Sequence, residues 1–299
     1  MNWVNTSILS AAVFGIVNIL DSHFLSKRLP NLQSFFLPLS IIYLIYCSVF
    51  LSIFPIPPDT SIGIILLGIA SGMFRTSGAV IMLSSLTRDE VSRVIPISLS
   101  YPIFVASLAV PLLGEHLHYT EWLSIIIVVA GAIMISTNRR PSGTSINWKQ
   151  LSLLCASSLL FALSDLSSKY VLHYMSSWEL FGLVAFSMFA IMLAISFRTN
   201  TIRQLANLKK KKVTYALLVF NEILTMAAIF LVLWAIERGP VSLVSTISST
   251  RPMFVLIFAF LLSRIAPSFL NWQPGRGLLS LRIIAVAMIV GGITIIHLA

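Results

Sequence analysis

Apolar residues occur in runs of about 20 along almost the whole chain, and short polar connections separate these runs. A helix of about 20 apolar residues is long enough to cross the hydrocarbon core of a bilayer. The pattern therefore predicts an all-α integral membrane protein with ten transmembrane helices. These helices are expected near residues 3–25, 33–54, 61–85, 92–113, 119–137, 148–172, 177–197, 213–236, 240–263 and 279–298.

The second half of the chain repeats the first. Asn2-Trp3 and Asn147-Trp148 open equivalent helices, and residues 91–104 align without a gap on residues 241–254. Two five-helix units follow, residues 1–140 and 141–299. Because five is an odd number, the second unit must cross the membrane in the opposite direction, which makes the pair an inverted repeat.

The basic residues of the connections support this inversion. The connections between helices 1 and 2, 3 and 4, 5 and 6, 7 and 8, and 9 and 10 hold basic residues from Lys27 to Arg282, whereas the other connections hold only Arg238. Cytoplasmic loops of membrane proteins are enriched in Lys and Arg. The basic connections are therefore expected in the cytoplasm, and both termini are expected outside the cytoplasmic membrane.

Composition argues against several other classes of protein. The chain is 57% hydrophobic and 10% charged, with a mean hydropathy of +0.94, so no sizeable extramembrane domain is expected. The basic connections account for the net charge of +10, and a nucleic-acid partner is not expected. The sequence has no P-loop, dinucleotide fingerprint or nucleophile elbow. We therefore expect no enzyme activity, no cofactor or metal, and no obligate protein partner.

Three ionisable residues lie deep in the predicted helices, where charge is costly and usually functional. They are Arg75, Glu222 and Arg251. One interpretation is that Glu222 pairs with either arginine and only fixes helix packing. The other is that the excess arginine binds a carboxylate or phosphate of a solute, which suits its planar guanidinium. Glu222 is the candidate proton-coupling group.

Further residues are expected to fix helix packing or to take part in coupling. Asp165 and Lys169 are spaced i, i+4, so they can pair along one helix face. Asp21 lies near the expected cytoplasmic end of helix 1. Gly68 and Gly72 form a GxxxG pattern, which predicts a close helix contact.

Helices 4 and 9 carry matching polar and proline residues near their middles. Pro102 and Pro252 fall inside the two predicted helices, where each removes a backbone hydrogen bond. Ser100, Tyr101 and Thr250 come just before these prolines. An interrupted pair of helices is typical of a transporter whose solute binds at the membrane midplane, although small hydroxyl residues also allow close helix packing.

The end of the first repeat resembles a known family. Leu112-Leu113-Gly114-Glu115 is followed by Thr120, Trp122 and Gly131-Ala132-Ile133, which is similar to the repeat ending of the ten-helix EamA branch of the drug/metabolite transporter superfamily. The second repeat departs from this pattern, since it has Leu262-Ser263-Arg264 at the matching place. The resemblance implies a secondary carrier of amino acids or other metabolites, often an exporter, with relatives that exchange nucleotide sugars or organic phosphates.

Together these observations predict a permease that exports a small metabolite, an amino acid or related solute, by alternating access. The alternative is an antiporter of organic phosphates or nucleotide sugars. The expected partners are the solute, the lipid bilayer and protons. Helices 1, 3, 4, 6, 8 and 9 are expected to surround the solute. The expected solute-binding residues are Arg75, Glu222, Arg251, Tyr101, Thr250 and Ser100.

Overall fold

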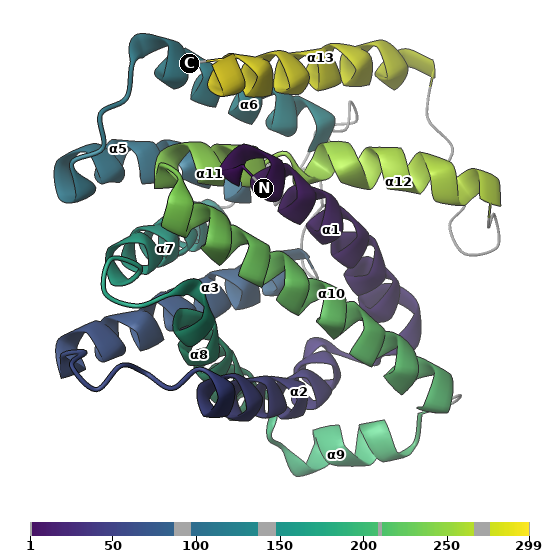
Figure 1. Cartoon of the computed structure of the whole chain (residues 1–299). Helices are drawn as coiled ribbons and strands as arrows, with labels where there is room; N and C mark the ends of the chain where they lie inside the picture. Colours follow the sequence, from purple (N-terminus) through teal and green to yellow (C-terminus); the bar gives the residue numbers. More distant parts are fainter. Residues whose placement is uncertain (1, 87–96, 137–147, 209–210, 266–275, 299) are drawn as a thin grey trace.

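The structure is a computed structural model of the chain, and it describes residues 2–86, 97–136, 148–208, 211–265 and 276–298. Within these ranges all regular structure is helical (Figure 1). Nine helical stretches of the described residues are long and apolar enough to cross a membrane, and the shorter apolar helix Tyr101–Leu113 adds the described part of the fourth predicted helix. The predicted fold class is confirmed.

The helices follow the two predicted repeats. The first repeat contains α1 (Trp3–His23), the π-helical segment η1 (Phe24–Arg28), α2 (Leu32–Ile53), α3 (Ile62–Leu86), α5 (Tyr101–Leu113) and α6 (Tyr119–Ser136). The second contains α7 (Trp148–Val171), α8 (Ser177–Ser196), α9 (Thr199–Ala206), α10 (Lys211–Arg238), α11 (Val241–Ser248), α12 (Arg251–Ile265) and α13 (Arg276–Leu298). The short helix α9 was not predicted, the ninth predicted helix is divided into α11 and α12, and residues 92–96 of the fourth lie outside the described residues.

Local sequence determines several helix ends. The Asn31 side chain accepts a hydrogen bond from the Ser34 N–H at 2.8 Å and so caps α2. Helix α5 ends at Gly114, whose φ of 67° is a left-handed conformation that glycine adopts without strain. The Gly-Glu turn therefore ends α5 and places Glu115 immediately beyond it.

The two repeats interlock through equivalent pairs of helices. Helix α2 packs on α8, α3 on α7, α1 on α10, α5 on α11, and α6 on α13. An inverted repeat produces this pattern, because the α3–α7 contact of one unit corresponds to the α10–α1 contact of the other. In Figure 1, α6 and α13 lie side by side at the top of the view, away from α2, α3 and α8.

A pair of hydrogen bonds establishes the register between the repeats. The Ser157 hydroxyl of α7 donates to the Gly78 carbonyl of α3 at 2.8 Å, and the Ser10 hydroxyl of α1 donates to the Ala228 carbonyl of α10 at 2.9 Å. Gly78 and Ala228 are separated by the same 150 positions that align residues 91–104 with 241–254. The acceptor helices α3 and α10 are therefore related by 150 positions, whereas the donors on α1 and α7 are 147 positions apart.

The bundle has two ends, which we name by their connections. The basic end holds the connections around residues 24–31 and 197–208. The far end holds the connections around residues 54–61, 114–118, 172–176 and 239–240. The sequence predicts that the basic end faces the cytoplasm.

Candidate functional site

Helices α11 and α12 are two halves of one span, separated by a turn at Ser249–Thr250. The Thr250 N–H donates to the Ile247 carbonyl at 3.1 Å, and the Met253 N–H donates to the Thr250 carbonyl at 2.9 Å. Both bonds reach back three residues, as in a tight turn, and the Thr250 hydroxyl also donates to the Ile247 carbonyl at 2.7 Å. The expected interruption of this helix is confirmed.

The fourth helix is interrupted at the equivalent position. The Ser100 N–H donates to the Ile97 carbonyl at 3.2 Å, the Ile103 N–H donates to the Ser100 carbonyl at 3.1 Å, and the Ser100 hydroxyl donates to the Ile97 carbonyl at 2.7 Å. Each bond has its counterpart 150 residues later. The two repeats therefore break the same helix with the same local geometry.

Two details of the predicted breaks need correction. Pro102 and Pro252 are the second residues of α5 and α12, where a missing N–H leaves no helical bond unmade, so they begin half-helices instead of interrupting continuous ones. The Ser100 and Thr250 hydroxyl groups already donate to carbonyls within their own turns, those of Ile97 and Ile247. Only the oxygen lone pairs of these two residues are available to a solute.

The residues that follow the two breaks, Tyr101 and Arg251, occupy equivalent positions. The Tyr101 hydroxyl donates to the Ser245 carbonyl at 3.2 Å. The Arg251 guanidinium lies over the Phe14 ring, 3.8 Å from its centroid. Its Nε is buried and has no hydrogen-bond partner among the described residues. A buried donor of this kind is ready to bind an acceptor.

Arg75 and Asp165 form a buried ion pair between the repeats. Arg75 Nη2 lies 2.6 Å from Asp165 Oδ1, and the Ser245 hydroxyl donates to Asp165 Oδ2 at 2.6 Å. This network joins α3, α7 and α11. Arg251 lies close enough to Arg75 and Asp165 for their charges to interact, and the Tyr101 phenol lies beside the same three groups. We call Arg75, Tyr101, Asp165 and Arg251 the break cluster.

The ion pairs considered from the sequence are not the ones that form. Arg75 binds Asp165, so Glu222 is not its partner. Asp165 does not pair with Lys169, because Asp165 points into the bundle towards α3. The Lys169 ammonium instead donates to the carbonyls of Ile236 and Gly239 at 2.8 and 2.9 Å, where the carbonyls at the end of α10 attract a cation.

Glu222 belongs to a second polar group nearer the basic end. Asn221 Nδ2 donates to Asp21 Oδ1 at 2.8 Å and lies 3.4 Å from Glu222 Oε1. The Tyr43 phenol of α2 lies beside Glu222. We call Asp21, Tyr43, Asn221 and Glu222 the carboxyl cluster. Helix 2 was not expected to contribute to the polar interior, but Tyr43 does.

The far end is closed by a tight contact between α3 and α8. A Cβ atom on Gly72 would lie 2.7 Å from the Ser187 Cβ and 2.9 Å from the Val184 Cα, so only glycine fits there. A Cβ atom on Gly68 would lie 2.8 Å from Leu183 Cδ1. The close helix contact predicted from the GxxxG pattern is confirmed.

Aromatic rings fill the far end between α2, α8 and α10. The Trp178 ring lies 4.1 Å from that of Phe230 and 4.8 Å from that of Phe54, and Phe50 contacts Phe181 at 4.6 Å. These rings join three helices of the two repeats. Phe230 contacts both Trp178 and Phe181 in this cluster.

Glu115, from the Gly-Glu turn, ties the far end of the first repeat to α11. Its carboxylate accepts hydrogen bonds from the Val241 N–H at 2.5 Å, the Ser242 N–H at 3.3 Å and the Ser242 hydroxyl at 2.6 Å. A carboxylate at a helix N-terminus satisfies free N–H groups and opposes the positive end of the helix dipole. The motif therefore holds one half of an interrupted helix in place.

We expect the Glu115→Ala variant to loosen α11, because the variant removes the carboxylate cap. The loss should lower the free energy of unfolding by about 1 to 2 kcal/mol and should speed amide hydrogen exchange in α11, measured by mass spectrometry. Glu121→Ala is the control, since Glu121 accepts from the His118 N–H within its own connection. Equal exchange in α11 for both variants would show that Glu115 does not hold this helix.

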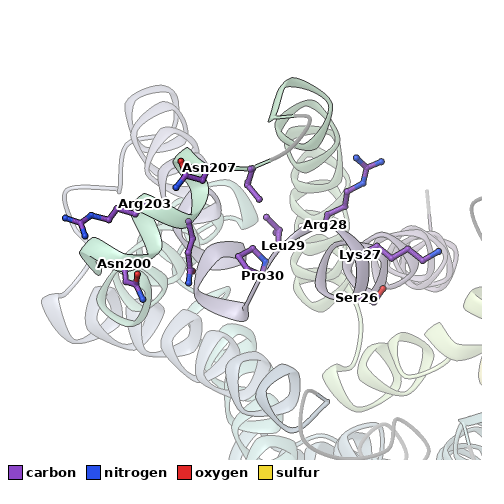
Figure 2. Close-up of a pocket in the computed structure, with 10 residues that line it drawn as sticks. Ser26, Lys27, Arg28, Leu29, Pro30, Asn200, Arg203 and Asn207 are labelled. Atoms are coloured by element: carbon purple, nitrogen blue, oxygen red, sulfur yellow. The ribbon is translucent and has the colours of Figure 1, made fainter.

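The basic end has a hollow of about 600 Å³ between the α1–α2 connection and α9. Figure 2 shows Leu29 and Pro30 between the two walls, with Lys27 and Arg28 on one side and Arg203 of α9 on the other. A smaller hollow of about 420 Å³ lies at the edge of the far end, beside Tyr170 and Tyr174. Of these two hollows, the larger opens at the basic end.

Four residues of these polar groups were not predicted from the sequence. Ser245, Asn221, Tyr43 and Phe14 each touch an ionisable residue that was a candidate. Asn221 could have been found, because it is an amide deep in an apolar helix beside Glu222. The other three resemble ordinary packing residues, and only their neighbours distinguish them.

The sequence profile of the EamA-like transporter family matches residues 1–137 and 148–298. No curated protein matches the chain. A solved structure, titled only as the crystal structure of a protein, aligns with 99% of this chain and 95% of its own, with a TM-score of 0.71 and 17% sequence identity. At that identity the likeness shows the fold alone.

Proposed function

This chain belongs to the EamA-like transporter family, whose profile covers both repeats, and on that premise we propose that it is a secondary active transporter of a small carboxylate-bearing metabolite. The expected solute is an amino acid or a related compound, exported across the cytoplasmic membrane. Alternating access would take place around the paired helix breaks. Figure 1 places these breaks where α11 meets α12 and at the start of α5.

The observation that carries this proposal is the Arg251 guanidinium. It stands at the first residue after a helix break, its Nε has no partner among the described residues, and its face rests on Phe14. Guanidinium groups bind carboxylates through two parallel hydrogen bonds. A solute carboxylate in the break would satisfy the unpaired donor.

The charges of the break cluster favour a carboxylate over a phosphate. Arg75 and Arg251 bring two positive charges and Asp165 brings one negative charge, and Arg75 already binds Asp165. One positive charge is left, which a carboxylate balances. A phosphate monoester carries about −1.5 to −2 at neutral pH and would leave excess negative charge in the apolar interior.

The antiporter of organic phosphates or nucleotide sugars remains the second candidate. It is favoured by one observation, the Arg75 Nε, which is also buried without a hydrogen-bond partner among the described residues. Two unfilled guanidinium donors could together bind a more highly charged group.

Counterflow into proteoliposomes distinguishes the two candidates. We expect trans-stimulated uptake of one or more amino acids, which other carboxylates inhibit, and weak inhibition by sugar phosphates. Strict exchange of organic phosphates or nucleotide sugars, with no amino-acid uptake, would instead support the antiporter. Protein-free liposomes and liposomes with the Arg251→Ala variant are the controls.

A further inference from the structure

The carboxyl cluster is buried and incompletely bonded. Asn221 and Glu222 are 0% and 1% exposed, and Asp21 is partly buried. Both carboxyl groups reach the same amide nitrogen, that of Asn221. Two oxygens, Asn221 Oδ1 and Glu222 Oε2, are buried without a hydrogen-bond partner among the described residues. The cluster therefore has free acceptors and few donors.

The groups that face Glu222 bring no positive charge. Helix α1 contributes Asp21, and α2 contributes Tyr43 and Tyr46. Among the described residues, α7, α8 and α11 place no ionisable group against Glu222. The basic side chains closest to Asp21 along the chain are His23, Lys27 and Arg28, in the connection at the basic end. Two carboxylates that share one site in a medium of low dielectric constant cannot both stay ionised without a cation. The simplest cation is a proton held between them.

The inverted repeat identifies the residue of the first unit that is equivalent to Glu222. At the 150-residue offset that relates Gly78 of α3 to Ala228 of α10, Glu222 of α10 corresponds to Gly72 of α3. Gly72 is the residue whose missing side chain lets α3 lie against α8 and close the far end. The corresponding closure of the basic end would bring α10 against α2.

The α3–α8 contact that closes the far end has a glycine, Gly72, at its centre. The equivalent α10–α2 contact at the basic end would have Glu222, a carboxyl group, at the same position. In the present state the Asp21 side chain is only partly buried. Water can then supply or remove a proton. When α10 moves onto α2 this access is lost, so an ionised carboxylate would be left in an apolar contact without a counter-charge, which is strongly unfavourable.

We propose that Asp21, Asn221 and Glu222 form a proton-binding gate: binding of a proton allows α10 to close on α2, and loss of the proton holds the basic end open. The inference rests on the proposed function, because it assigns this motion to alternating access. It requires no solute, so it can be tested without knowing what the protein carries.

The test measures the distance between α10 and α2 by pulsed electron spin resonance in lipid nanodiscs. The native Cys47 and Cys155 are first replaced by serine, and spin labels are attached at Val219→Cys and Ile41→Cys, two exposed positions towards the basic end. Lowering the pH from about 9 to about 5 covers the range in which buried carboxyl groups titrate. We expect the α10–α2 distance to shorten. A second pair, Leu66→Cys on α3 and Phe186→Cys on α8, should separate as the far end opens.

Neutral variants separate the gate from a general effect of pH. Glu222→Gln keeps the size of the side chain, and it should give the short α10–α2 distance at both pH values. Asp21→Asn should reduce the pH response, and Glu179→Gln, at the far end of α8, should leave it as in the wild type. Replacing sodium with a bulky organic cation at constant pH should leave the distances unchanged.

Three results would overturn the proposal. The first is a wild-type distance that does not change with pH, and the second is a Glu222→Gln variant that still responds like the wild type. The third is a distance set by sodium instead of protons. If the protein transports solute but the α10–α2 distance does not change with pH, only this inference is wrong. If no solute is transported but the α10–α2 distance shortens at low pH, the proton-binding gate is supported and the proposed function is wrong.

Discussion

We expect the Arg251→Ala variant to lose almost all transport while it remains folded. Each hydrogen bond to a charged group contributes about 1.5 to 3 kcal/mol, so loss of a two-bond contact should weaken solute binding at least about 100-fold. The side chain makes no ion pair among the described residues, and its main contact is the Phe14 ring. Its removal should therefore cost binding much more than stability. Counterflow kinetics in proteoliposomes and thermal unfolding in detergent measure the two effects separately.

Two further variants test the chemistry of this contact. Arg251→Lys keeps the charge but not the planar fork, so it should recover only part of the lost affinity. Arg238→Ala is the matched control, because Arg238 also lies over a ring, that of Trp234 at 4.0 Å, but at the exposed far end and paired with Glu237. It should transport like the wild type. Normal transport by Arg251→Ala, or an equal loss in Arg238→Ala, would remove Arg251 from the binding site.

The Asp165→Asn variant is expected to be strongly destabilised. Asp165 is 3% exposed and binds both Arg75 and Ser245, so the substitution leaves a buried guanidinium without its counter-charge. Removing one partner of a buried ion pair lowers the free energy of unfolding by about 3 to 5 kcal/mol. Thermal or denaturant unfolding in detergent would show the loss, and expression of folded protein should fall with it.

A double substitution shows whether the ion pair itself is required. Arg75→Met combined with Asp165→Leu removes both charges and fills the space with apolar atoms, so much of the stability should return. Transport should not return, because the double variant loses the Arg75 donors and the Asp165 carboxylate that holds Ser245, although the net charge of the break cluster is unchanged. If the two single losses simply add in the double variant, the two side chains are not coupled and the pair does not account for the instability.

The positions of the spans could be predicted from sequence because the cause is local. A helix in a membrane must satisfy its own backbone hydrogen bonds and present an apolar surface along its length. Apolar runs therefore revealed the helices, and residues 91–104 and 241–254 revealed the repeat. Helix α9 escaped prediction because it is short and mostly polar. The breaks were expected near Pro102 and Pro252, but the turns precede these prolines.

The polar residues of the interior were found by their depth, but their partners were not. Arg75, Arg251 and Glu222 stood out because charge is costly in a membrane. Asp165 was considered with Lys169 because four residues along a helix are neighbours. The structure instead joins it to Arg75, and the reason is the rotation of α7, which directs Asp165 towards α3 and lets Lys169 reach the end of α10.

The sequence by itself determined the spans, the inverted repeat, the basic connections and the identity of the deep charged residues, because each depends on composition or on spacing along the chain. Only the tertiary structure decided that Arg75 binds Asp165, that Arg251 is left without an ion-pair partner among the described residues, and that Asn221 links Asp21 to Glu222. These contacts join residues 90 and 200 positions apart. They depend on which helices are neighbours and how each is rotated, and packing across the whole bundle sets both.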